Sequence, residues 1–477
     1  MPSVIMTRSG PLVRLCPWVK AIEPLLEYDY IEFNGGFSGE KRALYFLDGD
    51  CGYFPAGFQQ PVGEALSRMG IETSLVDERD RGRLFRPFQW GLISELRAGQ
   101  KEVLNAILAH DHGQIVCATG FGKSFLIGEL IRGLPDSRFI VTAPGISETR
   151  NLYSRLKDIV PAAELGLLGA GSKDPPDRRV TVAVSRSLHK ADFEHCDLFL
   201  FDEAHMCGHN TLTHMLLTRL GDSRNYGFTA TPKGRSDKSD KVIESVFGQP
   251  IAEFNYSDCV TAGNVAPIDV IFYDVPGDVQ ASKSPFGNKL VQNKRRFYWR
   301  NEVRNLTIAA VCRSLPETEH VLVMVDSVDH LLHLAVLLPE YALVYGEGND
   351  LAKRAAALKI TLMNRHSNSK EEHEKIYEEF RNGSIRRVIA TGVYKQAVDF
   401  PLLSVLVRAD GSPSPILSSQ IPGRLSRLSR GKGHGVLVDF RDLFNSTAKG
   451  HYHARLKNYR KNGWSIDHRG DILSEEG

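Results

Sequence analysis

The stretch Leu198-Phe199-Leu200-Phe201-Asp202-Glu203-Ala204-His205 places four apolar residues directly before two adjacent acids. The apolar run has the length of a buried strand, so the acids would stand side by side at its end. Two neighbouring carboxylates repel one another unless a positive charge lies beside them. The stretch therefore predicts a buried strand that ends at a site for a cation.

A glycine-rich segment upstream indicates what that positive charge is. Residues 117–124, Cys-Ala-Thr-Gly-Phe-Gly-Lys-Ser, follow an apolar run and open a segment with helical spacing, which is the setting of a P-loop. Thr119 lies in this loop, and Gly120 and Gly122 would let backbone N–H groups close around phosphates. Lys123 would reach the β- and γ-phosphates, so the segment predicts a nucleoside triphosphate site for ATP.

The acids complete that site. Ser124 and Asp202 would supply oxygen ligands to Mg²⁺, and Glu203 would polarise the attacking water. A metal ion and a triphosphate make two adjacent carboxylates tolerable. The alternative of a strand-end turn with two solvated acids does not explain why a P-loop precedes them in the right order.

Composition describes an ordinary globular chain. Its 477 residues are 42% hydrophobic and 24% charged, which is enough for two or three domains with sizeable cores. The formal net charge is only +2, so the total neither supports nor excludes a nucleic-acid partner. No run is apolar and long enough to span a membrane, and the start lacks the apolar run of a signal peptide.

The seven cysteines are scattered singly, which favours reduced thiols over a disulfide framework. We therefore expect a monomer in the cytoplasm of a bacterium or of a phage-infected cell, with no membrane partner.

Strand-like and helix-like segments alternate along most of the chain, which predicts doubly wound parallel sheets. In the first half, strands are expected at 114–118, 138–143, 180–184, 197–201 and 226–229, with helices at 123–133 and 148–159. In the second half, strands are expected at 269–274, 320–325, 387–390, 404–408 and 433–439, with helices at 301–314, 328–338 and 370–382.

The fold class is therefore α/β, with two tandem doubly wound domains preceded by a small α+β domain. The expected boundaries are 1–88 for the N-terminal domain, 89–262 and 263–450 for the two α/β domains, and 451–477 for a basic C-terminal tail.

Further motifs occur in a fixed order around the P-loop and the acids. Leu96-Arg97-Ala-Gly-Gln100 precedes the P-loop, Gly227-Phe-Thr-Ala-Thr-Pro232 follows the acids, and Gln420-Ile-Pro-Gly-Arg-Leu-Ser-Arg427 lies near the C-terminus. With the Asp-Glu-Ala-His motif, this set resembles superfamily two helicases, ATPases built from two RecA-like domains. The resemblance covers roughly residues 85 to 450.

The resemblance implies roles for these residues. Arg97 and Gln100 would lie near the adenine, and Arg424 and Arg427 would act as arginine fingers on the γ-phosphate. Gln420 and Asp399 would lie on the nucleotide side, although Ala397 stands where the family often has glycine. The positions implied in coupling to nucleic acid are His205, Thr229, Thr231, Thr391, Pro144 and Ser185.

Details within the motifs look like those of XPB-like and UvsW-like helicases, which act on duplex and branched DNA. A glutamine opens the last motif, and Gly263-Asn-Val-Ala-Pro267 marks the domain junction. The N-terminal domain resembles the small N-terminal domain of UvsW-type helicases in its order of strands and helices, and we expect it to take part in substrate recognition.

A basic segment near the start of the second α/β domain is a candidate nucleic-acid contact. Lys294, Arg295 and Arg296 precede Phe297, Tyr298 and Trp299, so phosphate neutralisation and base stacking are both conceivable here. The alternative is that the aromatic residues anchor a loop to the domain core while the cations are merely solvated. A second basic stretch, 451–461, is more typical of a solvated closing helix.

The sequence is thus interpreted as an ATP-dependent DNA helicase or translocase that remodels branched or forked DNA. A duplex translocase subunit of a restriction system, an RNA helicase, and a nucleic-acid-sensing ATPase switch stay open as alternatives.

Overall fold

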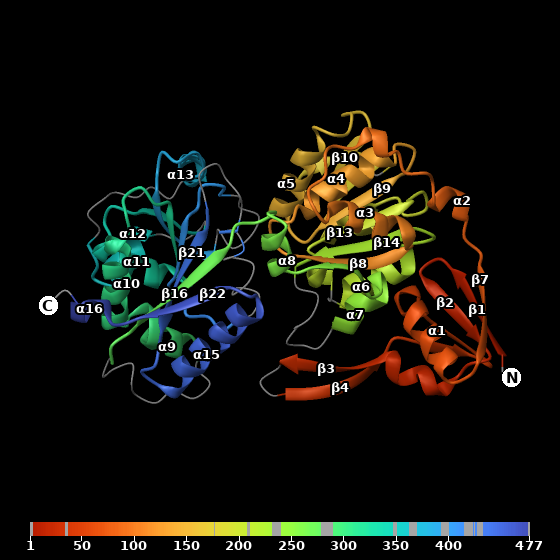
Figure 1. Ribbon diagram of the computed structural model, residues 1–477, viewed down its shortest axis with the longest axis horizontal. Coiled ribbons are helices and arrows are strands. Elements are labelled where there is room, and N and C mark those ends of the chain that lie inside the picture. Colours follow the sequence, from red (N-terminus) through yellow and green to blue (C-terminus); the bar gives the residue numbers. More distant parts are fainter. Residues whose placement is uncertain are drawn as a thin grey trace. The chain divides into compact units, whose positions relative to one another are not determined.

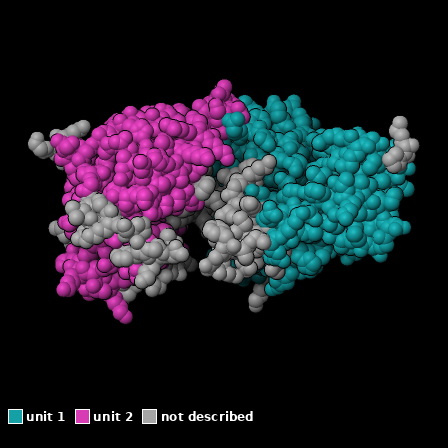
Figure 2. Space-filling model, turned by 90° about the horizontal axis from the view of Figure 1, so that it is seen from below, with its two compact units in different colours: residues 1–255 teal, residues 256–477 magenta. Residues whose placement is uncertain are grey.

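The computed structural model divides the chain into two compact units, residues 1–255 and 256–477 (Figures 1 and 2). It describes residues 3–33, 37–175, 177–207, 210–230, 240–277, 290–346, 351–361, 370–392, 400–414, 423, 425–426 and 433–475. None of the helices in these ranges combines the length and the apolar character that a membrane crossing requires.

The first unit begins with a five-stranded mixed sheet in the order β5-β6-β2-β1-β7. Its strands are β1 (Ser3–Ser9), β2 (Leu12–Cys16), β5 (Phe46–Asp48), β6 (Cys51–Pro55) and β7 (Glu72–Asp77). Alternate residues of β1 are buried, so one face of the sheet packs on a core that includes Val62 and Leu66 of α1 (Gln59–Arg68). Two short helices, η1 (Lys20–Leu25) and η2 (Ala56–Phe58), flank this layer.

Two further strands form a separate ribbon. β3 (Glu27–Phe33) and β4 (Phe37–Ala43) pair antiparallel, and Figure 1 shows them extending away from the five-stranded sheet. The small α+β domain expected from the sequence is present, but the separate ribbon of β3 and β4 was not among the expectations. Turn residues indicate where a chain reverses, and they do not say which strands will pair.

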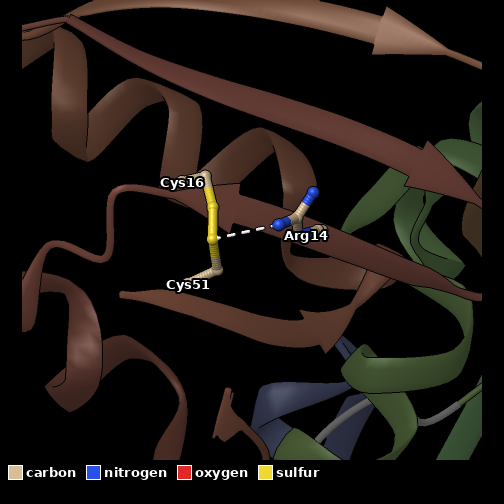
Figure 3. Close-up of a disulfide and its surroundings, with 3 residues drawn as sticks. All are labelled: Arg14, Cys16 and Cys51. Atoms are coloured by element: carbon tan, nitrogen blue, oxygen red, sulfur yellow. Dashed lines mark hydrogen bonds between the residues drawn. A yellow bond between two sulfur atoms is a disulfide. The ribbon is translucent and has the colours of Figure 1, made fainter. Parts of the chain in front are cut away.

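Cys16 and Cys51 form a disulfide between the ends of β2 and β6, and Arg14 donates a hydrogen bond to the Cys51 sulfur at 3.2 Å (Figure 3). The expectation that all the thiols are reduced is therefore wrong for this pair. Their Cα atoms are 4.6 Å apart because the two strands are neighbours, which their 35-residue separation in sequence does not reveal. The other five cysteines are buried and lie outside this disulfide.

The N-terminal sheet packs directly on the α/β layer that follows it within the first unit. Arg8 is only 1% exposed, and its guanidinium contacts Asp111 at 2.7 Å. Gly57 lies against helix α7 (Asp240–Phe247), where a Cβ atom would come within 2.0 Å of the Glu244 carbonyl oxygen. The small domain is thus attached through a buried interface, as well as by the connecting chain.

The α/β layer of the first unit is a doubly wound sheet with the order β11-β10-β12-β9-β13-β14-β8-β15. Every described pairing in it is parallel except that of β10 with β11. Its strands are β8 (His112–Cys117), β9 (Phe139–Ala143), β10 (Leu165–Gly169), β11 (Ser172–Lys173), β12 (Val180–Val184), β13 (Leu198–Asp202), β14 (Arg224–Thr229) and β15 (Pro250–Phe254). Its other helices are α2 (Arg81–Leu84), η3 (Trp90–Leu92), α3 (Gln100–Ala109), α4 (Lys123–Gly133), α5 (Ile146–Leu156), η4 (Ser185–Lys190), η5 (Ala204–Cys207) and α6 (Asn210–Arg219).

The second unit is built on a parallel sheet with the order β18-β19-β17-β20-β21-β16-β22. Its strands are β16 (Ile268–Asp274), β17 (Val321–Met324), β18 (Ala342–Val344), β19 (Arg387–Ala390), β20 (Val405–Arg408), β21 (Gly435–Arg441) and β22 (Ser465–Arg469). Its helices are α8 (Tyr256–Thr261), α9 (Leu290–Lys294), η6 (Arg295–Trp299), α10 (Glu302–Ser314), α11 (Val328–Leu337), α12 (Leu351–Ala357), α13 (Lys370–Asn382), α15 (Ser446–Lys461) and α16 (Ile472–Glu475).

Side chains from both faces of this sheet are buried. Val321 and Val323 of β17 pack in a core with α10, α11 and α12, while Leu322 and Met324 pack in a second core with α13 and α15. The sequence expectation of two tandem doubly wound RecA-like domains behind a small mixed domain is confirmed.

The C-terminal residues differ from the expectation. Residues 451–475 are not a tail, because α15 buries Tyr452 and Leu456 in the second core and β22 pairs with β16. The division between the units, at residues 255 and 256, also falls slightly before the expected position near 262.

Candidate functional site

Three loops that carry motifs identified in the sequence meet at one edge of the first doubly wound sheet. β14 lies between β13 and β8, and all three strands run parallel. The glycine-rich loop follows β8, the paired acids end β13, and Thr229 ends β14. Because ligands of such sheets bind beyond the carboxyl ends of the strands, this edge is the candidate site.

The glycine-rich loop has the backbone that phosphate binding needs. Gly120 and Gly122 have φ values of 93° and 104°, which side chains with a Cβ atom rarely adopt. A Cβ atom on Gly122 would also lie 2.8 Å from the Gln100 amide nitrogen. Helix α4 starts at the next residue, so its unpaired backbone N–H groups open toward the loop.

Lys123 and Ser124 connect this loop to the acids. The Lys123 side chain is almost fully buried, and its Nζ donates to the Cys117 carbonyl oxygen at 3.2 Å. The Ser124 hydroxyl donates to Asp202 Oδ2 at 3.3 Å. Burial raises the pKa of Asp202 to about 6, and the neighbouring Glu203 acts in the same direction, while Lys123 opposes both. Burial therefore disfavours the charged form of Asp202 in the protein alone.

These residues fit ATP with Mg²⁺. A hydroxyl and a carboxylate in contact are hard oxygen ligands, and a bound cation would favour the charged form of the buried Asp202 carboxylate. The loop with its two left-handed glycines leaves backbone donors for phosphate oxygens. Ser124 and Asp202 would hold the metal ion, and Lys123 would leave Cys117 to contact phosphate.

Glu203 stands in a strained turn beside this site. Its φ of 57° is unusual for a residue with a side chain and costs on the order of 1–3 kcal/mol. Its N–H donates to Asp202 Oδ1 at 3.1 Å, and its Oε2 lies 3.4 Å from His205 Nδ1. The Glu203 carboxylate thus lies beside His205.

His205 extends the site to the end of β14. Its Nδ1 lies 3.2 Å from the Thr229 hydroxyl, and both residues are buried. The acid motif and the threonine motif are thus linked by a direct contact. Thr231, the other coupling residue expected in that motif, lies outside the described residues.

Gln100 holds the glycine-rich loop through hydrogen bonds of its side-chain amide. It is fully buried, its Nε2 donates to the Phe121 carbonyl oxygen at 2.9 Å, and its Oε1 accepts from the Arg97 N–H at 2.9 Å. The rings of Phe121 and Phe254 stack beside this contact, with their centroids 5.1 Å apart. Both ends of the Gln100 amide are thus occupied by the protein, and Phe254 is a support residue that the sequence analysis missed.

Two other expected positions of the first unit come together. The Ser185 hydroxyl donates to the Pro144 carbonyl oxygen at 2.9 Å, because β9 and β12 are adjacent and end at the same edge. In the second unit, the Thr391 N–H donates to the Val344 carbonyl oxygen at 3.0 Å, directly after β19. The remaining expected residues, Asp399, Gln420, Arg424 and Arg427, lie outside the described residues.

The basic segment of the second unit is largely neutralised by aspartates. Lys294 Nζ lies 2.6 Å from Asp326 Oδ2, and Arg295 and Arg300 both contact Asp329, at 3.3 and 2.8 Å. These aspartates follow the apolar strand β17, the same signal that identified the paired acids after β13, and the sequence analysis missed them.

The aromatic residues of that segment are buried. Phe297, Tyr298 and Trp299 are at most 8% exposed and form their own core cluster with Phe444. The interpretation that they stack on bases is therefore wrong for this conformation, and the alternative of a loop anchored to the domain core is correct.

Comparisons with known proteins agree with this geometry. Residues 93–234 match the family model described as "Type III restriction enzyme, res subunit". The chain is 24% identical over 376 residues to the DNA 3'-5' translocase XPB2 of Sulfurisphaera tokodaii, covering 72% of this chain and 80% of that protein.

Similar folds occur among solved structures. A fragment of a putative HsdR subunit of a type I restriction enzyme from Vibrio vulnificus aligns with 93% of this chain and 92% of its own, at a TM-score of 0.57 and 15% identity. The crystal structure of T4 UvsW aligns with 98% of this chain and all of its own at 15% identity, with a TM-score of only 0.42.

Proposed function

We propose that this chain, an ATP-dependent motor of helicase superfamily two, translocates on DNA and remodels branched or forked molecules. The observation that carries the proposal is the chain of contacts from Ser124 through Asp202 and Glu203 to His205 and Thr229. Through these contacts, a change in the nucleotide at the phosphate site can alter the position of Thr229 at the end of β14. Similarity to a DNA translocase supports DNA as the nucleic acid.

The residues at the nucleotide have distinct tasks. Lys123 binds the β- and γ-phosphates, and the loop N–H groups orient them. Glu203 accepts a proton from the attacking water. Bound Mg²⁺ would supply positive charge to the phosphate oxygens. Arg424 and Arg427 are proposed to stabilise charge on the γ-phosphate in the transition state, and Gln420 and Asp399 to contact the nucleotide.

Coupling to DNA is proposed to run through the ends of the strands. His205 and Thr229 pass the nucleotide state on, since their side chains are in direct contact. Pro144, Ser185 and Thr391 end strands at the same type of edge and are proposed phosphate contacts. Thr231 is proposed to act with Thr229.

Lys294, Arg295 and Arg296 are proposed to contribute to DNA binding. Lys294 and Arg295 must release Asp326 and Asp329 to do so, which lowers the gain from each contact.

A second candidate is a duplex translocase subunit of a restriction system, favoured by the family model over residues 93–234. Such a subunit would move on duplex DNA without separating strands. ATPase stimulation that is equal on blunt duplex and on forks, with no strand displacement, would favour it.

The deciding experiment measures ATP hydrolysis on single-stranded DNA, blunt duplex, fork, Holliday junction and RNA duplex, alongside strand displacement. The proposal expects the greatest stimulation on forks or junctions, with unwinding. Stimulation by RNA alone would instead indicate an RNA helicase. Nucleic-acid binding without continuous turnover would indicate an ATPase switch, and either result would overturn the proposal.

A further inference from the structure

Helix α15 of the second unit carries a row of basic side chains on its exposed face. Five of its exposed positions hold cationic or titratable side chains, namely Lys449, His453, Lys457, Arg460 and Lys461. Lys449, His453, Lys457 and Lys461 recur every four residues, so they fall on one side of the helix. No acid occurs between Asp442 and Asp467 in the sequence.

The opposite face of α15 fixes the helix in place. Arg455 is fully buried and contacts Asp439 at 2.9 Å and Asp442 at 3.2 Å, and the Tyr459 hydroxyl donates to Asp439 at 2.6 Å. Tyr452 packs on Phe272 of β16 in the same core. Each buried charge on this face of α15 has a partner, so the helix is held firmly against the sheet and its exposed cations have a fixed position. In Figure 1, α15 is the dark blue helix below β22.

The two basic segments of this unit therefore differ in what neutralises them. Lys294 and Arg295 contact Asp326 and Asp329, whereas the structure shows no ion pair to Lys449, Lys457 or Lys461 among the residues it describes. An unpaired cation has no aspartate to release before it binds an anion. On this ground α15 is a better anion-binding surface than the segment from Lys294 to Arg296, whereas the sequence analysis favoured that segment.

Helix stability does not account for this arrangement. Cations are favourable in the last turn of a helix, where Arg460 and Lys461 lie, but unfavourable in the first turn. Lys449 lies near the start of α15, whose first turn has no acid. The charges extend from Lys449 to Lys461, about 18 Å at 1.5 Å per residue, a length that spans several phosphates of one DNA strand.

We propose that the exposed face of α15 is a docking surface for the phosphate backbone of DNA, separate from the strand-end loops. This inference rests on the proposed function for the identity of the polyanion. The contacts neutralise phosphates without reading bases, because lysines on a helix surface act as point charges. The surface therefore holds duplex DNA of any sequence on the second unit.

The test replaces Lys449, Lys457 and Lys461 together by Gln, which keeps helix propensity while removing charge. Duplex DNA affinity of the full chain is measured without nucleotide over a series of salt concentrations. Three lost phosphate contacts should reduce the slope of log affinity against log salt by about 2.7. The control, Lys20→Gln, Lys157→Gln and Lys375→Gln, removes the same charge from exposed positions elsewhere and should leave the slope nearly unchanged.

The outcomes separate this inference from the proposed function. A slope equal to that of the wild type, or an equal loss in the control, overturns the docking surface even if DNA still stimulates ATP hydrolysis. A reduced slope in a chain that DNA does not stimulate keeps the surface and overturns the motor function. Loss of binding to vesicles of one part phosphatidylglycerol and three parts phosphatidylcholine, with DNA binding intact, would identify an anionic membrane instead and overturn the proposal.

Discussion

Arg8 and Asp111 are 103 residues apart in sequence, yet their side chains meet at 2.7 Å within the first unit. Arg79 reaches the same Asp111 oxygen at 2.6 Å, and both arginines are 1% exposed. One carboxylate thus contacts two buried cations from the N-terminal domain, and Asp77 also contacts Arg79, at 2.8 Å. The small domain and the first RecA-like domain are joined by this cluster within the first unit.

Asp111→Asn should destabilise this junction by about 3–5 kcal/mol, because the buried Arg8 guanidinium loses the one carboxylate partner described for it, while Arg79 keeps only Asp77. The loss is measured from amide hydrogen exchange in β1 and β8, since a chain of two units does not have to unfold in one step. Glu64→Gln is the control, because its pair with Arg68 is exposed and such pairs contribute about 0–1 kcal/mol. Equal protection in both variants would mean that the cluster does not hold the junction.

The junction should also weaken in acid. Burial alone would raise the pKa of Asp111, but its hydrogen bond with His112 and the charges of His112, Arg8 and Arg79 hold that pKa well below the usual range. A carboxylate of this kind stabilises the fold above its unfolded pKa, about 3.9, and the contribution is lost as the pH falls through the folded value. Protection of β1 and β8 should therefore fall below about pH 5, and less steeply in Asp111→Asn. The same pH slope in both proteins would contradict this assignment.

Lys123→Ala should abolish ATP turnover while the fold is kept. Among the residues the structure describes, Lys123 makes no ion pair and the one hydrogen bond described for its side chain goes to the Cys117 carbonyl, so its removal breaks no described ion pair. Steady-state hydrolysis and circular dichroism are measured together. Near-normal turnover in a folded variant would show that the loop is not a nucleotide site.

Glu203→Gln should bind ATP but stall hydrolysis, because the amide keeps the shape of the side chain and loses the base. Nucleotide binding by a fluorescent ATP analogue and single-turnover hydrolysis give the two quantities separately. We expect affinity close to that of the wild type with DNA binding raised in the ATP state. If this variant fails to bind ATP, Glu203 shapes the phosphate or metal site and is not the base.

Arg424→Ala and Arg427→Ala should each slow hydrolysis far more than they weaken ATP binding. A charge that acts mainly on the transition state changes the rate and leaves ground-state binding almost intact. Arginine fingers contribute on the order of 10³ to 10⁵ in rate, or about 4–7 kcal/mol. DNA-stimulated turnover at saturating ATP is compared with that of Arg381→Ala, whose arginine pairs with Glu378 on the exposed face of α13. A loss below about threefold would rule out this role.

Local sequence patterns predicted much of the fold correctly. Helices α4 and α13 have the same ends as the segments expected from the sequence, 123–133 and 370–382, because helical spacing and flanking glycines are read from neighbouring residues. The sequence analysis assigned Ser124 and Asp202 to one Mg²⁺ site, and their side chains are in contact because motifs after parallel strands meet at one edge of the sheet.

The sequence analysis did not predict contacts between segments that are far apart in the chain. The pairing of Cys16 with Cys51, the burial of Phe297 to Trp299, and the neutralisation of Lys294 by Asp326 all depend on which strands become neighbours.

The sequence by itself determined two RecA-like sheets, a P-loop and paired acids, because periodicity and short motifs are properties of adjacent residues. Only the tertiary structure decided which charges are free to bind a partner. Lys294 and Lys457 are both lysines in basic stretches, yet Lys294 contacts an aspartate and Lys457 faces solvent on α15. The physical reason is that a charge is neutralised by its neighbours in space, and burial and pairing are set when the chain has folded.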